Sequence, residues 1–168
     1  LSTPTAGSIS ETTGSSDTTV SGLSGFLSAT DADGDALTYG IAGGTVVGDE
    51  SILSGTYGTL SVNTTTGEYI YTPSSADIVE LCAGSFEDSF TVSVSDGSET
   101  ATSTYTVNIT TLDNPAVITG DLTGSITENS VAGTITGTID ITDECAVQQP
   151  RFSDVSSTTT TNGYGSFS

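Results

Sequence analysis

Apolar and polar residues alternate along most of the chain with a period of two, and Gly, Asn-Thr and Asp-Gly punctuation separates the runs. This alternation is typical of half-buried β-strands, whereas helical stripes with a period of 3.6 are almost missing. The pattern predicts an all-β fold, because seven short strands in about 110 residues is the number expected of a β-sandwich. The predicted strands are 5–11, 19–30, 36–42, 58–63, 68–72, 89–95 and 100–110.

The sequence also indicates two turns and one helical segment that departs from the strand pattern. The loop 63–67, Asn-Thr-Thr-Thr-Gly, predicts a hairpin between the strands on either side, and Asp96-Gly97 predicts a second hairpin. Segment 74–83 follows Pro73 with cap-type residues, so it predicts one or two helical turns that cross the edge of the sandwich.

Three short matches recur in the same order along the chain. Residues 7–11 (GSISE) return as 124–128 (GSITE), Thr30-Asp31 returns as Thr142-Asp143, and 57–61 (YGTLS) returns as 164–168 (YGSFS), at offsets of 117, 112 and 107. Internal repetition of this length indicates tandem domains. We expect one full antiparallel Greek-key sandwich at 1–112 and about half of a second repeat at 113–168, with the boundary at 112–115, where Pro115 cannot join a central strand.

Half a sandwich does not bury both of its sheets. The second repeat is therefore either cut short or completed by strands from elsewhere, and a head-to-tail completion between identical chains would produce a filament. The sequence leaves both possibilities open.

Acidic residues dominate the charge of the chain. There are 21 Asp and Glu residues against a single basic residue, Arg151, and the formal net charge is −20 over 168 residues. No basic patch is available to neutralise phosphates, which excludes nucleic acid as a partner. Clustered carboxylates favour hard divalent cations such as Ca²⁺, although a salt-adapted acidic surface is the alternative explanation.

The sequence offers little catalytic chemistry. His is absent, so the commonest general base is missing, and the many Ser and Thr residues have no His or Lys to activate them. Paired carboxylates for glycoside hydrolysis are not excluded by their number. We expect a protein that is not an enzyme and that does not insert into a membrane, because no apolar run approaches 18 residues.

One acidic loop has the spacing of a cation ligand set. Residues 31–35, Asp-Ala-Asp-Gly-Asp, place carboxylates on alternate residues with a Gly that permits a sharp turn. An EF-hand is rejected, because its twelfth position would be Ala42. The simpler interpretation is an Asp-rich turn between two strands.

Three segments carry a resemblance to a known family. Residues 28–39 (SATDADGDALTY), 58–62 with 69–73, and 88–97 (DSFTVSVSDG) resemble the cadherin-like repeats of large bacterial calcium-dependent surface adhesins. The resemblance implies a cadherin-like or immunoglobulin-like sandwich with calcium at the junctions between consecutive domains. It also implies that the protein is secreted or lies at the cell surface.

The resemblance further implies a set of calcium ligands. The loop at 31–35 would serve a preceding domain, while Glu11, an acidic pair preceding the penultimate strand and the linker residues would face the following one. In the second repeat Cys145 stands where the first has Asp33, so this inner junction would hold fewer ions. The implied ligands are Glu11, Asp31, Asp33, Asp35, Glu87, Asp88, Asp113, Asn114, Asp143 and Glu144.

The two cysteines have no CxxC spacing and no His partner, which argues against zinc and against a Cys/His nucleophile. The resemblance implies that Cys82 and Cys145 approach the inner junction from its two sides. A disulfide between them would join the repeats at the junction where stiffening by calcium is weakened. Two unrelated buried thiols are the alternative.

These observations predict a structural extender of an extracellular adhesin, stiffened by Ca²⁺ between neighbouring repeats, that holds a distal adhesive module away from the cell. A subunit of a self-assembling filament or surface layer, with identical subunits as partners, is the first alternative. A calcium-dependent carbohydrate-binding module is the second, although the absence of Trp argues against it.

Overall fold

A computed structural model of the chain describes residues 1–11, 20–113, 115–121, 123–125, 136–143, 145, 151–152, 158–159 and 166–167. The chain divides into two compact units. The first consists of Leu1–Asn114 with Glu144–Ala146, and the second of Pro115–Asp143 with Val147–Ser168.

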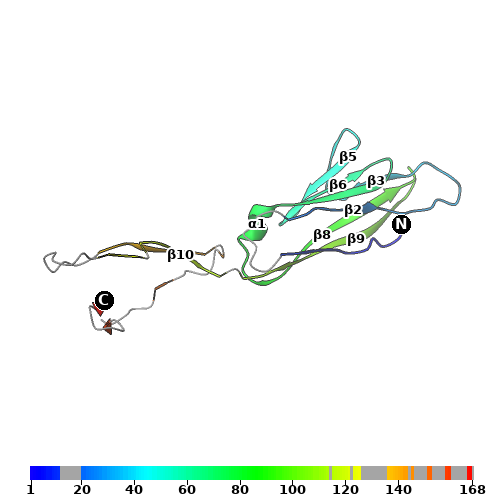
Figure 1. Cartoon of the computed structure of the whole chain (residues 1–168). Helices are drawn as coiled ribbons and strands as arrows, with labels where there is room; N and C mark the ends of the chain where they lie inside the picture. The colour runs from blue at the N-terminus through cyan, green and yellow to red at the C-terminus, as the bar shows by residue number, and fades with distance from the viewer. Residues whose placement is uncertain are drawn as a thin grey trace. The chain divides into compact units, whose positions relative to one another are not determined.

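The first unit contains two β-sheets, which are drawn in blue to green in Figure 1. One sheet has the order β1 (Gly7–Ser10), β9 (Thr100–Thr111), β8 (Gly84–Ser95) and β3 (Thr38–Ile41). The other has the order β2 (Leu23–Phe26), β7 (Glu68–Pro73), β6 (Gly58–Asn63), β5 (Glu50–Ser54) and β4 (Thr45–Val47). The prediction of an all-β sandwich is confirmed.

The sheets are antiparallel with one exception among the described strands. β1 pairs with β9 in parallel, with Gly7 opposite Val107 and Ser10 opposite Thr110. A parallel neighbour is possible here because β1 and β9 are joined through the whole domain and not by a tight hairpin, which would force antiparallel pairing. The first and last strands of the sandwich therefore lie side by side and point the same way.

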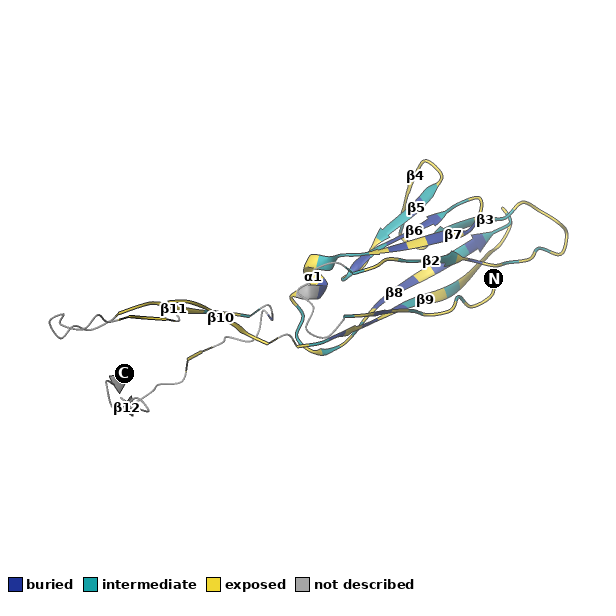
Figure 2. Cartoon of the chain, viewed as in Figure 1, coloured by how far each residue is buried: buried dark blue, intermediate teal, exposed yellow. Residues whose placement is uncertain are grey.

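The core lies between the two sheets and follows the period-two alternation. Buried side chains on β6 and β7 face buried side chains on β8 and β9, and Figure 2 shows them as dark blue positions along these strands. Aromatic rings cross the core, with the Tyr69 and Tyr105 ring centroids 4.7 Å apart and those of Tyr71 and Phe90 6.0 Å apart. Because the chain has no Met or Trp, the described core is built from Ile, Leu, Val, Tyr and Phe.

The predicted strands match the structure with three main differences. The strand predicted at 19–30 is much shorter, since β2 covers only Leu23–Phe26. β8 begins at Gly84, five residues before its predicted start, and β4 and β5 were not predicted. β4 and β5 are joined by the two residues Gly48 and Asp49, and Gly48 has a positive φ of 62°. Gly-Asp is a recognised hairpin signal, but the exposed TVV strand before it has no alternation to reveal it.

The loop at 63–67 forms the predicted hairpin. The side chain of Asn63 accepts hydrogen bonds from the backbone N–H groups of Thr65 and Thr66 at 3.1 and 2.9 Å, and Gly67 has a φ of +72°. An Asn that bonds to the backbone two and three residues later stabilises a tight turn. The predicted helical segment is also present as α1 (Ser75–Val79).

Two two-stranded antiparallel sheets lie in the described part of the second unit. β10 (Val117–Gly120) pairs with β11 (Ile139–Thr142), and β12 (Thr158–Thr159) pairs with β13 (Ser166–Phe167). Apolar side chains on β10 are exposed, with Val117 at 56% and Ile118 at 51%. The predicted repeats at 124–128 and 164–168 fall largely outside the described residues.

Acidic loops and a disulfide at the two ends of the sandwich

The two ends of the sandwich are defined by β9. This strand has 12 residues, which at about 3.4 Å per residue separate its ends by roughly 40 Å. The turn from β8 to β9 contains Asp96, and we call this the Asp96 end. The opposite end, where β9 runs into Leu112 and Asp113, is the Asp113 end.

The loop at 31–35 is organised by its first carboxylate. Oδ1 of Asp31 accepts hydrogen bonds from the backbone N–H groups of Asp33, Gly34 and Asp35 at 2.9, 2.7 and 2.9 Å. Gly34 has a φ of +85°, a conformation that the loop needs in order to turn back on itself. The carboxylates of Asp33 and Asp35 lie on the exposed face of this loop.

A second acidic turn lies at the same end. Oδ1 of Asp96 accepts hydrogen bonds from the backbone N–H groups of Ser98 at 2.7 Å and Glu99 at 2.8 Å. These bonds, that from Glu99 foremost, hold the pKa of Asp96 below its usual range. Asp96 therefore stays ionised in moderately acidic solution.

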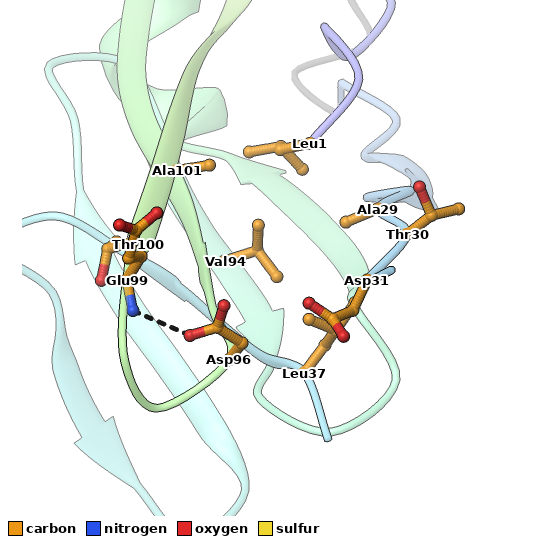
Figure 3. A pocket seen from close by; sticks show the side chains of 10 residues that line it. All are labelled: Leu1, Ala29, Thr30, Asp31, Leu37, Val94, Asp96, Glu99, Thr100 and Ala101. Atoms are coloured by element: carbon orange, nitrogen blue, oxygen red, sulfur yellow. Dashed lines mark hydrogen bonds between the residues drawn. The ribbon is translucent and has the colours of Figure 1, made fainter. Parts of the chain in front are cut away.

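The two turns line one hollow at the Asp96 end. Its volume is about 160 Å³, and Asp31, Asp96 and Glu99 stand around apolar side chains that include Leu37 and Val94. Figure 3 shows the Asp31 carboxylate on one side of this hollow and Asp96 with Glu99 on the other. β3 begins directly after the first loop and places Thr38 opposite Ser95, so the strand register brings the loops together.

The sequence pattern points to Asp31 as a ligand but not to Asp96 or Glu99. Asp96-Gly97 predicts a hairpin and belongs to a segment that carries the resemblance, but nothing in its spacing indicates a ligand. Pairing the strand that begins near residue 36 with the strand that ends at 95 would have placed both turns at one end of the sheet.

The donor set at this end fits a hard cation. All the carboxylates supply oxygen, and Ca²⁺ takes six to eight oxygen ligands at about 2.3–2.6 Å. The carboxylates of Asp31, Asp96 and Glu99 are not all within 4.8 Å of one another in the described structure. If a cation bound in this hollow, these carboxylates would supply only part of its ligand shell.

At the Asp113 end, Glu11 is held against the start of the linker. Its Oε2 accepts a hydrogen bond from the backbone N–H of Leu112 at 2.8 Å, and its own N–H donates to the Thr110 carbonyl at 3.0 Å. Asp113 follows directly and is exposed. β1 therefore delivers a carboxylate to the point where the chain leaves the sandwich.

Cys82 and Cys145 form a disulfide at the Asp113 end, with their Cα atoms 4.9 Å apart. The Thr111 hydroxyl donates to the Cys82 carbonyl at 2.6 Å, which ties the disulfide to the last residue of β9. A carboxylate oxygen of Asp113 lies within 4.8 Å of the Cys145 sulfur. Because that sulfur is bonded to Cys82, it is not available as a thiolate ligand for a metal.

Asp88 has a different environment from the one implied by the resemblance. Its side chain is 3% exposed and accepts hydrogen bonds from the N–H groups of Thr56 and Tyr57 at 2.8 and 3.0 Å and from the Tyr71 hydroxyl at 2.7 Å. Three donors surround the two oxygens, so Asp88 holds the β5–β6 loop against the core. Glu87, by contrast, is exposed on β8 opposite Asn108.

Three of the implied ligands remain to be placed. Asn114 and Glu144 lie outside the described residues, and Asp143 is a half-buried residue of the second unit that follows β11.

Within the described residues, no helix has the length and hydropathy needed to cross a membrane. No curated protein matches this chain. A family model described as the bacterial cadherin-like domain matches residues 2–111, which covers the first unit almost completely. Domains of this kind are typically non-enzymatic structural modules of extracellular proteins, and they generally bind calcium. The chain therefore belongs to the bacterial cadherin-like domain family.

Proposed function

We propose that this chain is an extender segment of an extracellular adhesin, in which Ca²⁺ at the ends of each sandwich fixes the angle between consecutive repeats. The observation that carries the proposal is the meeting of two acidic turns, around Asp31 and Asp96, at one end of the sandwich. The segment performs no catalysis. Its task is to add length and stiffness between a cell and a distal adhesive module.

Residues at the Asp96 end would contribute to the junction with a preceding domain. Asp31 keeps the loop rigid through Oδ1, and among the described residues its Oδ2 makes no hydrogen bond. Asp33, Asp35, Asp96 and Glu99 supply further oxygens from two adjacent turns. The incomplete ligand shell is what a shared site requires, because the neighbouring domain then supplies the missing oxygens. When that domain is absent, water supplies them and the ion binds more weakly.

Residues at the Asp113 end would contribute to the junction with the following repeat. Glu11 and Asp113 lie on either side of Leu112, where the sandwich ends. In the second unit Asp143 occupies the sequence position of Asp31, and its role as a ligand stays a prediction.

An internal correspondence supports the proposal of tandem repeats. In the first unit the backbone N–H of Ser2 donates to the Ser28 carbonyl at 2.8 Å. The sequence offsets of 117 and 112 carry these two residues to Thr119 and Asp140, which are directly paired in the β10–β11 ladder. A backbone contact between corresponding residues therefore occurs in both units.

Calcium would act by reversing an electrostatic repulsion. With 21 acidic residues and one basic residue, adjacent repeats carry like charge at every junction. A divalent ion that bridges carboxylates of two domains replaces this repulsion with attraction and removes freedom at the hinge. It also stabilises the folded chain, because the unfolded chain binds the ion more weakly.

A calcium titration of the whole chain tests the proposal, with thermal melting and small-angle X-ray scattering as readouts. We expect a higher melting temperature and a narrower distribution of shapes with Ca²⁺, and a smaller response with Mg²⁺, which prefers a rigid octahedral site. The triple variant Asp31→Asn, Asp33→Asn, Asp35→Asn should reduce the calcium response.

A matched variant controls for the loss of charge. Asp49→Asn, Asp77→Asn, Glu80→Gln removes the same number of charges from exposed positions away from the two turns. This variant should respond to calcium like the unmodified chain. An equal response in both triple variants, or no response in the unmodified chain, would refute the calcium mechanism.

A second candidate function is a subunit of a self-assembling filament, in which a neighbouring chain covers the second unit. Leu27 is 4% exposed in the first unit, whereas Ile139, its counterpart at the offset of 112, is 39% exposed. A partner strand on β10–β11 would bury Ile139. Sedimentation analysis over a range of protein concentrations separates the two candidates, because a filament subunit polymerises even after calcium is removed and an extender remains monomeric.

A further inference from the structure

The disulfide creates a shortcut in the covalent path of the chain. Cys82 lies between α1 and β8, and Cys145 lies 63 residues further along the sequence. Both cysteines belong to the first unit, although the chain leaves that unit at Pro115 and returns at Glu144. A single S–S bond thus connects two points that the backbone joins only through β8, β9, β10 and β11.

The bypassed loop contains the most extensive strand pairing of the sandwich. β8 and β9 have 12 residues each and pair without interruption from Gly84–Thr111 to Ser95–Thr100. They carry five of the 13 residues of the described core cluster, namely Phe90, Val92, Tyr105, Val107 and Ile109.

The base of this loop is closed by further contacts at the Asp113 end. The Thr111 hydroxyl bonds to the Cys82 carbonyl, and the Leu112 N–H bonds to Glu11. Cys145 is 5% exposed, so the disulfide is an integrated part of the domain end and not a loose surface crosslink.

We propose that the Cys82–Cys145 disulfide is a mechanical clamp that diverts tension around the β8–β9 hairpin. When the chain is pulled from its two ends, the force passes from Cys82 directly to Cys145, and residues 83–144 carry none of it. This inference rests on the proposed function, because an extender between a cell and its target is under tension.

The topology shows why such a clamp matters. Without the disulfide, tension leaves the sandwich through the end of β9, while β1 beside it is pulled the other way. The first sandwich then opens completely. With the disulfide, strands before Cys82 can be pulled away, but the loop that contains β8 and β9 bears no tension and stays closed at its base, so the other strands have a compact partner on which to pair again. The clamp therefore limits the extension of the chain under force and speeds its refolding after the force is released.

The effect has a definite size. Cys82 and Cys145 are separated by 63 positions in the sequence, and at about 3.5 Å per extended residue the disulfide hides roughly 220 Å of chain from the pulling force. A fully stretched oxidised chain is shorter than a fully stretched reduced chain by this amount.

Single-molecule force spectroscopy of the whole chain, pulled from its ends, tests the clamp. We expect the total contour length to increase by about 220 Å when the protein is reduced with dithiothreitol, and refolding after relaxation to become slower. A non-reducing peptide map of the same sample establishes its disulfide state. Equal contour lengths before and after reduction, or free thiols at Cys82 and Cys145 in the air-oxidised protein, would overturn the proposal.

The double variant Cys82→Ala, Cys145→Ala is the matched control, and it should give the long contour length with or without reductant. If this variant does not fold, reduction of the folded natural chain still gives the comparison. All measurements are repeated with calcium chelated. The contour difference should persist there, so that failure of the clamp and failure of the calcium mechanism are separate results.

Discussion

The Tyr71 hydroxyl donates a hydrogen bond of 2.7 Å to the Asp88 carboxylate, and this bond joins the two sheets of the sandwich. Tyr71 is fully buried on β7, and Asp88 is 3% exposed on β8. The other two donors to Asp88 are backbone N–H groups of the β5–β6 loop, so one carboxylate fixes both a core side chain and a loop. A buried charge of this kind is tolerated because its oxygens are surrounded by donors.

The first prediction concerns this carboxylate. Asp88→Asn should destabilise the first unit by about 2–4 kcal/mol, because the amide turns two donors toward groups that themselves donate. Tyr71→Phe should cost less, about 1.5–3 kcal/mol, since Asp88 keeps its two backbone donors. Urea unfolding measures both changes.

Neither substitution should alter calcium affinity, in contrast to the ligand role that the family resemblance implied for Asp88. Calcium titration of the folded Asp88→Asn variant decides between the two roles. Loss of binding without loss of stability would restore Asp88 as a ligand.

The second prediction concerns alkaline pH. Burial raises the pKa of Tyr71 well above its usual range, with the bond to Asp88 adding to the effect, and burial likewise raises the pKa of Tyr105. A raised pKa in the folded state means that the unfolded chain loses these protons first. Stability is therefore unaffected below the unfolded value of about 10 and falls as the pH rises above it.

A spectroscopic titration checks this. Phenolate absorbance should appear first from the more accessible of the six tyrosines, while Tyr71 and Tyr105 should ionise only together with loss of the β-sheet circular dichroism. Ionisation of all six near pH 10 in a folded protein would contradict the prediction.

The third prediction concerns close packing at the same point. A Cβ added at Gly58 would overlap the phenol of Tyr71, whose ring has no room to move because it is fully buried. Gly58→Ala should destabilise the unit by about 1–3 kcal/mol. Thr59→Ala on the next residue, which is half-buried, is the matched control and should change the free energy of unfolding much less. Similar urea midpoints for both variants would argue against this packing.

Sequence patterns predicted the sandwich because its core strands alternate cleanly. β6 and β7 bury every second residue, and the turn between them contains the Asn and Gly that its geometry needs. β4 could not be found in this way, since all three of its residues are exposed and an edge strand needs no buried face. The parallel pairing of β1 with β9 depends on contacts 100 residues apart, which no local pattern encodes.

The residues of the candidate site were likewise predicted only in part. The Asp31 loop was visible because its ligand spacing is local to five residues. The contribution of Asp96 and Glu99 depends on the β3–β8 register, which sequence periodicity does not specify. Asp88 looked like another member of an acidic pair, and only its position on an inward-facing residue of β8 assigns it to the core.

The last prediction separates the structural and the calcium-binding roles of Asp31. Asp31→Asn keeps an oxygen that accepts the three backbone hydrogen bonds of the loop, but it removes the negative charge. Asp31→Ala removes both. In calcium-free solution Asp31→Asn should unfold like the unmodified chain, whereas Asp31→Ala should lose about 0.5–2 kcal/mol, the usual cost of deleting a side chain that caps backbone N–H groups. With calcium present, both variants should bind the ion about tenfold more weakly, which corresponds to about 1.4 kcal/mol. Calorimetric titration beside urea unfolding distinguishes the roles, and unchanged calcium affinity in Asp31→Asn would leave Asp31 as a turn residue only.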